Sequence, residues 1–167
     1  DPGLQFEPIH RVLFNITVEE MLIAMGVYFG EEQFSLERSV DPQEMEAQLL
    51  KGRDRTENCH RIGFVTEAGY GVIRITNPKS DLEVGTLQSF LDEWLVQHPQ
   101  GEVDYIHGAE VVRKLGSQQG NIGFFLPALE KNALFKTIIH DGVLPRKSFS
   151  MGEAEEKRFY LECRRIK

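Results

Sequence analysis

Hydrophobic and polar residues alternate along this chain with two different periods, which mark its strands and helices. Strands place apolar side chains at every second position, whereas helices repeat them at intervals of three and four. The strand pattern covers residues 8–16, 33–40, 59–67, 70–76, 102–108, 121–128 and 158–166. The helical pattern covers residues 17–30, 41–52, 86–98, 109–115 and about 129–140.

Capping residues and one turn give these segments their boundaries. Thr17 and Glu20 have the spacing of a capping box, and Gly30 and Gly52 mark helix ends. Strands 59–67 and 70–76 are predicted to form a hairpin with its turn at residues 68 and 69. Because this antiparallel pair interrupts an alternation of strands and helices, we predict an α+β fold: a mixed sheet with a central antiparallel hairpin and several packed helices. A length of 167 residues is typical of one domain, residues 1–167.

The charge distribution limits the partners of this domain. The net charge is −7, which disfavours nucleic-acid binding, because nucleic-acid sites need a basic surface. Residues 143–167 nevertheless carry seven Lys or Arg and four Glu, a local charge of +3. This basic segment can hold a small anion, or it can be a solvated strand with outward-facing charges. No apolar run has the length of a membrane span, so no membrane partner is expected.

Several kinds of catalytic or cofactor site are not indicated. The glycine motifs that bind phosphate are absent, and so is the Gly-x-Ser-x-Gly motif of serine hydrolases. The five histidines share no ligand spacing with another His or Cys, since the adjacent Cys59 and His60 point to opposite faces of a strand. We therefore expect no metal and no cofactor. Cys59 and Cys163 are expected to be buried free thiols, as in a cytoplasmic protein.

Polar residues at the ends of predicted elements are the candidates for ligand binding, because α/β proteins place ligands at such ends. Two lie at the start of the first strand, one at the end of strand 102–108, and three follow Pro145. The candidates are His10, Arg11, His107, Arg146, Lys147 and Ser148. An alternative for Arg146 and Lys147 is an exposed strand start. His140 and Gly142 are explained by an ordinary helix end. No catalytic residue is assigned.

Three stretches resemble the C-terminal part of a bacterial and archaeal family of unknown function, DUF1015, and in particular its clostridial-type branch. They are "FEPIHRVLFN", "DYIHG" and "DGVLPRKSFSMGEAEEKRFYLECRRI". The resemblance, with a first residue that is Asp1 and not methionine, implies a C-terminal domain cut from a longer protein. Family members carry an Asp-Gly-His-His-Arg motif in an upstream half that is similar to the ParB/sulfiredoxin-like fold of free-serine kinases. This chain lacks that motif, so the resemblance supplies no catalytic residue here.

These observations lead to one expected function and two alternatives. We expect a cytoplasmic bacterial domain, non-catalytic by itself, that completes or regulates a nucleotide or phosphate site together with an upstream domain of the same protein. Arg11, Arg146 and Lys147 would then neutralise phosphate charge. The first alternative is a part of a small-molecule kinase of the free-amino-acid type. The second is a protein-interaction or dimerisation module, which would expose an apolar patch.

Overall fold

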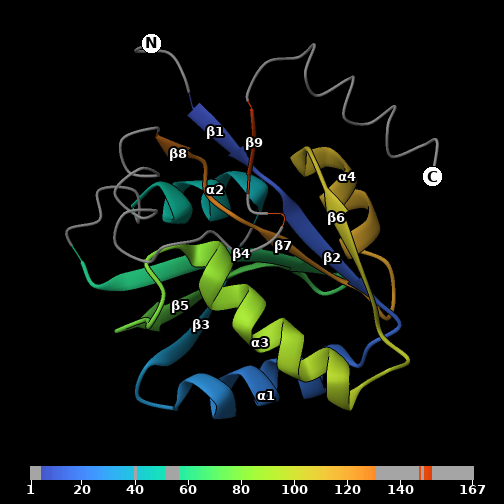
Figure 1. Ribbon diagram of the computed structural model, residues 1–167. Helices are drawn as coiled ribbons and strands as arrows, with labels where there is room; N and C mark the ends of the chain where they lie inside the picture. The colour runs from blue at the N-terminus through green and yellow to red at the C-terminus, as the bar shows by residue number, and fades with distance from the viewer. Residues whose placement is uncertain (1–4, 40, 52–56, 131–146, 148, 152–167) are drawn as a thin grey trace.

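The computed structural model describes residues 5–39, 41–51, 57–130, 147 and 149–151 (Figure 1). The helices in this part of the chain are α1 (Val18–Phe29), α2 (Pro42–Lys51), α3 (Glu83–Gln97) and α4 (Ala109–Gly116). Its strands are β1 (Gln5–Pro8), β2 (His10–Phe14), β3 (Phe34–Ser39), β4 (Cys59–Thr66), β5 (Gly69–Thr76), β6 (Glu102–Ile106), β7 (Ile122–Phe125), β8 (Leu129–Glu130) and β9 (Phe149–Met151).

The main sheet has six strands in the order β3-β5-β4-β7-β2-β6, and β8-β1-β9 form a smaller sheet. The expected α+β fold is confirmed, but every pairing among the described strands is antiparallel, where a mixed sheet was expected. The reason lies in the connections. Strands β2 and β3, which α1 connects, run in the same direction but are separated by β7, β4 and β5, so they never pair.

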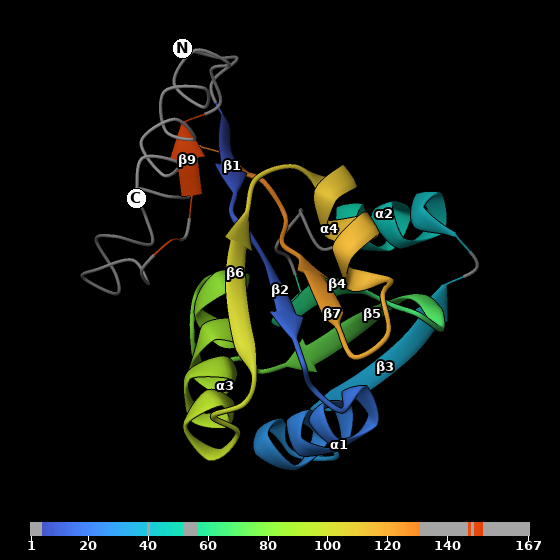
Figure 2. The same cartoon turned by 90° about the vertical axis from the view of Figure 1, so that its right-hand side faces the viewer.

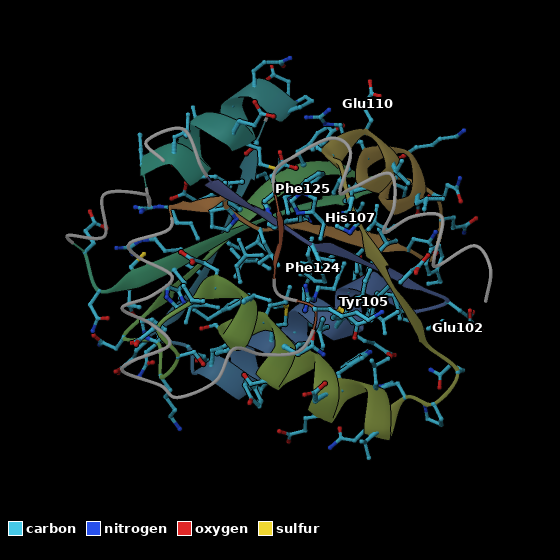
Figure 3. All side chains as sticks on the ribbon, turned by 45° about the horizontal axis from the view of Figure 1, so that its top comes forward. Glu102, Tyr105, His107, Glu110, Phe124 and Phe125 are labelled. Carbon is cyan, nitrogen blue, oxygen red and sulfur yellow. The ribbon has the colours of Figure 1, made fainter. Side chains whose placement is uncertain are left out.

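Two helices cover each face of the main sheet (Figures 1 and 2). Helices α1 and α3 pack on one face, and α2 and α4 pack on the other. Neighbouring residues of a strand therefore enter different cores, as Phe124 and Phe125 of β7 do (Figure 3). Alternation along β2 likewise sends Leu13 to the α1–α3 face and Val12 to the α2–α4 face.

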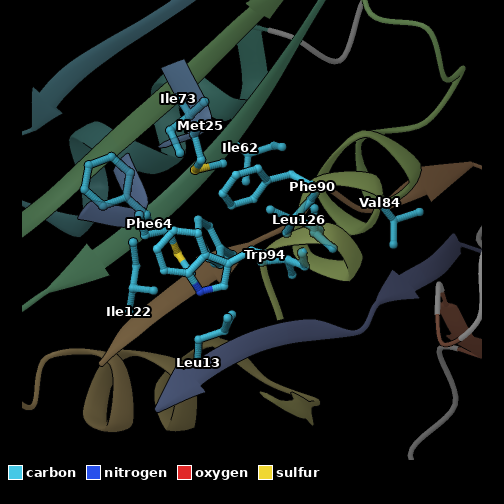
Figure 4. Packing of buried hydrophobic residues seen from close by; sticks show 14 of the residues in the cluster. Leu13, Met25, Ile62, Phe64, Ile73, Val84, Phe90, Trp94, Ile122 and Leu126 are labelled. Carbon is cyan, nitrogen blue, oxygen red and sulfur yellow. The ribbon is translucent and has the colours of Figure 1, made fainter. Parts of the chain in front are cut away.

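The larger core lies on the α1–α3 face (Figure 4). Trp94 and Phe90 of α3 stack with ring centroids 5.9 Å apart, and both are buried with Phe64 and Ile62 of β4. Burying a side chain of this size contributes roughly 1.5–3 kcal/mol. The smaller core, on the other face, contains Met45 of α2, which lies directly over Gly63. A Cβ at position 63 would lie 2.8 Å from Met45 Sδ and 3.1 Å from Leu49 Cδ1, so a larger residue here would force these α2 side chains to shift.

The predicted boundaries are largely confirmed, with identifiable exceptions. Asp41 Oδ1 accepts a hydrogen bond from the Glu44 amide at 2.8 Å, and Gly30 ends α1 with φ 98°. The Thr17 side chain makes no capping hydrogen bond, and α3 starts at Glu83, three residues before the predicted start. The hairpin β4–β5 is present, but its turn residues are 67 and 68, because Thr66 pairs with Gly69.

The structure also differs from the prediction near the two ends of the chain. The expected strand 8–16 is divided at Ile9 between β1 and β2, which belong to different sheets. The helix expected from about residue 129 was wrong for its first two residues, because Leu129 and Glu130 pair with β1 as strand β8. The remainder of that helix and the strand expected at 158–166 lie outside the described residues.

Candidate functional site

Arg11, one of the residues that the sequence singled out, is fully buried. Its Nε donates to Gln88 Oε1 of α3 at 3.0 Å. One terminal nitrogen donates to the carbonyl oxygens of Ile9 and, at 2.9 Å, of Lys147. The guanidinium thus connects β2, α3 and residue 147, which are far apart in sequence. This role as an internal cross-link uses donors that a phosphate ligand would need.

Arg11 and Lys147 share the ring of Tyr105, which β6 places directly opposite Arg11. The Arg11 guanidinium carbon is 4.9 Å and Lys147 Nζ is 4.7 Å from the ring centroid. Lys147 adopts a left-handed φ of 55°, which is uncommon for a residue with a side chain. Burial lowers the pKa of Arg11 to about 10, while Tyr105 and Asp92 act in the opposite direction. Arg11 therefore remains a cation at neutral pH.

His10 neighbours Arg11 in sequence but points to the other face of the sheet, toward Phe125. Its Nδ1 accepts a hydrogen bond from the Leu126 amide at 3.0 Å, so this nitrogen carries no proton. Burial, and then the positive charges of Arg11, His107 and Arg113, lower the pKa of His10 to about 4. A neutral imidazole on this face cannot act as a cationic phosphate ligand at pH 7.

The structure thus separates the six candidates into groups. Arg11 and Lys147 meet at Tyr105 on the α1–α3 face, whereas His10 lies on the α2–α4 face. His107, the half-buried residue that follows β6, is close enough to influence the pKa of His10. Arg146 and Ser148 lie outside the described residues, and a ligand site that includes them stays a prediction.

A second group of cations, which the sequence reasoning missed, surrounds a cavity of about 380 Å³. We call it the α2 cavity, because it lies between α2 and strands β3, β5 and β4. Its lining residues are Ser35, Glu37, Gln48, Lys51, Arg61, Val72 and Arg74. Three positive side chains and one carboxylate therefore face this space, together with hydroxyl and amide groups that can donate hydrogen bonds.

Arg61 and Arg74 are direct cross-strand neighbours in the hairpin β4–β5. Like charges placed opposite each other destabilise a sheet unless something neutralises them. Glu57 does so in part, with its Oε2 3.4 Å from an Arg61 nitrogen and 3.7 Å from an Arg74 nitrogen. Glu57 and Arg74 are both exposed, so these long ion pairs are worth about 0–1 kcal/mol each.

The sequence carried an incomplete signal for this pair. Arg74 lies between Ile73 and Ile75, and Arg61 directly precedes Ile62, so alternation along each strand directs both arginines away from the face of these isoleucines. The predicted turn at residues 68 and 69 would have placed Arg61 opposite Thr76. The observed turn, one residue earlier, places it opposite Arg74.

Within the described ranges, no three His, Cys, Asp or Glu side chains are grouped in a way that could hold a metal ion. The helices described in the structure include none that is long and apolar enough to cross a membrane. No family model, curated protein or solved structure matches this chain.

Proposed function

We propose that this domain binds a small anion of the phosphate class in the α2 cavity and is non-catalytic by itself. The observation that carries the proposal is the placement of Arg61 and Arg74 as cross-strand neighbours beside Lys51 around one cavity. In a longer protein of the kind that the sequence resembles, such a ligand would complete or regulate a site shared with the upstream domain.

The chemistry of the lining supports an anionic ligand. Guanidinium groups bind phosphate oxygens through two parallel hydrogen bonds, and such charge-assisted bonds are about twice as strong as neutral ones. An anion that bridged Arg61 and Arg74 would also relieve their mutual repulsion. Glu37 and Glu57 oppose binding, but the exposed Glu57 contacts are weak enough for a divalent anion to replace them.

Arg74 provides the sharpest test, because its side chain is 39% exposed and can be changed without disrupting the core. The protein is titrated calorimetrically with inorganic phosphate and with pyrophosphate at low ionic strength. Arg74→Gln should weaken pyrophosphate binding by about tenfold or more, since a hydrogen bond to a charged group contributes about 1.5–3 kcal/mol. Arg38→Gln is the matched control, because Arg38 is on β3 but lies over the Phe64 ring on the other face.

Equal affinities of the two variants, or no saturable binding of either anion, would remove the basis of the proposal. Binding that required the upstream domain would instead support the small-molecule kinase alternative.

One observation favours the interaction-module alternative. Ile23 and Val27 are one helical turn apart on α1 and are 69% and 77% exposed. Isolated exposed apolar residues are common, so two of them support this alternative less strongly than the α2 cavity supports anion binding. Sedimentation of the wild type and an Ile23→Ser, Val27→Ser double variant tests it: equal, monomeric behaviour over a wide concentration range would argue against self-association through α1.

A further inference from the structure

A second cavity, of about 350 Å³, lies on the opposite face of the sheet from the α2 cavity. We call it the α1–α3 cavity. Its walls include Tyr28 and Phe29 at the end of α1, Thr86 and Ser89 in α3, and the loop of residues 77–80. This volume is at the small end of the range of ligand sites, about 300–1,000 Å³.

The hydroxyl of Thr86 is oriented by a buried histidine. His60 Nε2 lies 3.2 Å from the carbonyl oxygen of Asp81, and a carbonyl can only accept, so Nε2 carries the hydrogen. When the ring is neutral, Nδ1 is an acceptor, and the Thr86 hydroxyl, 2.8 Å away, donates to it. The proton of Thr86 is thus directed into the protein, and its oxygen keeps lone pairs for a ligand.

Ser89 also presents an acceptor to the cavity. Its Oγ donates to the Thr86 carbonyl oxygen at 2.9 Å, so the hydroxyl oxygen of Ser89 also remains available only as an acceptor. The loop of residues 77–80, opposite α3, presents hydrogen-bond donors instead. Asn77 Oδ1 accepts from Asn58 Nδ2 at 2.9 Å, which leaves the Asn77 amide hydrogens as donors, and Lys79 lines the same cavity.

The α1–α3 cavity therefore combines two acceptors on α3, donors on the loop and an aromatic wall. Tyr28 and Phe29 meet edge to face, with centroids 4.9 Å apart, and Tyr28 remains 40% exposed. Aromatic side chains bind planar rings, and each stacked base contributes about 1–3 kcal/mol. A ligand that matches all three features is planar, carries an amino group for the acceptors and has ring nitrogens for the donors.

We propose that the α1–α3 cavity binds an amino-substituted nitrogen heteroaromatic ring of the adenine class. The amino group donates to the oxygens of Thr86 and Ser89, the ring lies against the aromatic wall, and ring nitrogens accept from Asn77 or Lys79. This site is separate from the α2 cavity and does not depend on the anion proposed there.

The test compares adenosine with purine riboside, which lacks only the amino group, by isothermal titration. Adenosine should bind saturably, and purine riboside should bind about tenfold more weakly or worse, because it leaves the buried Thr86 oxygen and the Ser89 oxygen without the donor that the amino group supplies. Thr86→Val and Ser89→Ala should each lower the affinity for adenosine by about tenfold. Ser89 is exposed, so its substitution keeps the test valid even if Thr86→Val weakens folding.

Ser117→Ala is the matched control. Ser117 Oγ donates to the Lys114 carbonyl oxygen at 3.1 Å, the same local bond that Ser89 makes, but it lies at the end of α4. Adenosine affinity should be unchanged in Ser117→Ala and in Arg74→Gln. The proposal is overturned if adenosine shows no saturable binding, if the amino group has no effect, or if Ser89→Ala binds as Ser117→Ala does. Weaker adenosine binding in Arg74→Gln would place the ligand in the α2 cavity and would also overturn it.

Discussion

The buried histidine of β2 should make this protein sensitive to mild acid. In the folded state, burial and neighbouring positive charges lower the pKa of His10 from 6.5 to about 4. Between these two pH values the unfolded chain binds a proton at this position and the folded chain does not. The free energy of unfolding therefore falls as the pH decreases through this window, and no further loss from His10 occurs below about pH 4.

The size of the effect follows from the same pKa difference. A difference of 2.5 between 6.5 and about 4 corresponds to about 3 kcal/mol, at 1.36 kcal/mol for each pH unit. The structure gives a second reason for a cost on protonation. A proton on Nδ1 would face the Leu126 amide, which now donates to that nitrogen, so two donors would oppose each other.

Urea unfolding between about pH 7 and about pH 4, for the wild type and His10→Asn, measures this contribution. Asparagine keeps a side-chain oxygen that can accept from the Leu126 amide, but it does not titrate. Over the window, wild-type stability should fall by about 3 kcal/mol more than that of the variant. Carboxylates that titrate in the same range affect both proteins equally, so they cancel in the comparison.

His98→Asn serves as a control for the loss of a histidine elsewhere, because this half-buried side chain follows α3 and stacks on Trp94. The stability difference from the wild type should change more with pH for His10→Asn than for His98→Asn. Parallel curves for the wild type and His10→Asn would refute the reasoning, because they would mean that His10 takes up its proton equally well in the folded and unfolded states.

Further predictions concern packing, and urea unfolding at pH 7 tests each of them. Arg11→Met should destabilise the protein by about 3 kcal/mol or more, because it leaves the buried acceptors of Arg11 without a donor; a smaller loss than about 1 kcal/mol would contradict its role as a cross-link. Gly71→Ala should cost about 2 kcal/mol, since its Cβ would lie 2.4 Å from Phe64 Cζ, and a variant as stable as the wild type would show that this core can relax. Gly26→Ala should instead stabilise α1 by up to about 1 kcal/mol, because its Cβ meets the Phe34 ring at an ordinary 3.5 Å; a loss of stability would contradict this.

The local structure was largely predictable because short-range chemistry determines it. The side-chain period identified the helices and the hairpin, and Asp41 and Gly30 marked helix ends through interactions within one turn. The same periodicity contained a signal that the sequence reasoning missed, since Arg74 lies between Ile73 and Ile75 and so faces away from them. These features require only the conformation of the nearest few residues.

Pairing between strands that are far apart in the sequence determined the features that the sequence did not predict. The sequence pattern of β2 is equally compatible with many neighbours, so the strand order, the all-antiparallel pairing and the strand at Leu129 appeared only in the folded sheet. A shift of one residue in the hairpin turn changed the partner of Arg61 from Thr76 to Arg74, and with it the composition of the α2 cavity.

The candidate ligand residues also show the difference between what the sequence predicts and what the fold determines. Arg11 lies at the start of a predicted strand, where α/β proteins often place ligands, so sequence reasoning assigned it to a ligand. In the fold, Gln88 and two carbonyl groups, brought together from distant segments, supply the acceptors that make its burial possible. The sequence by itself therefore determined which residue types occupy each element and face. Only the tertiary structure decided which of them bind one another and which remain available to a ligand, because burial and hydrogen-bond partners are set by residues far apart in the chain.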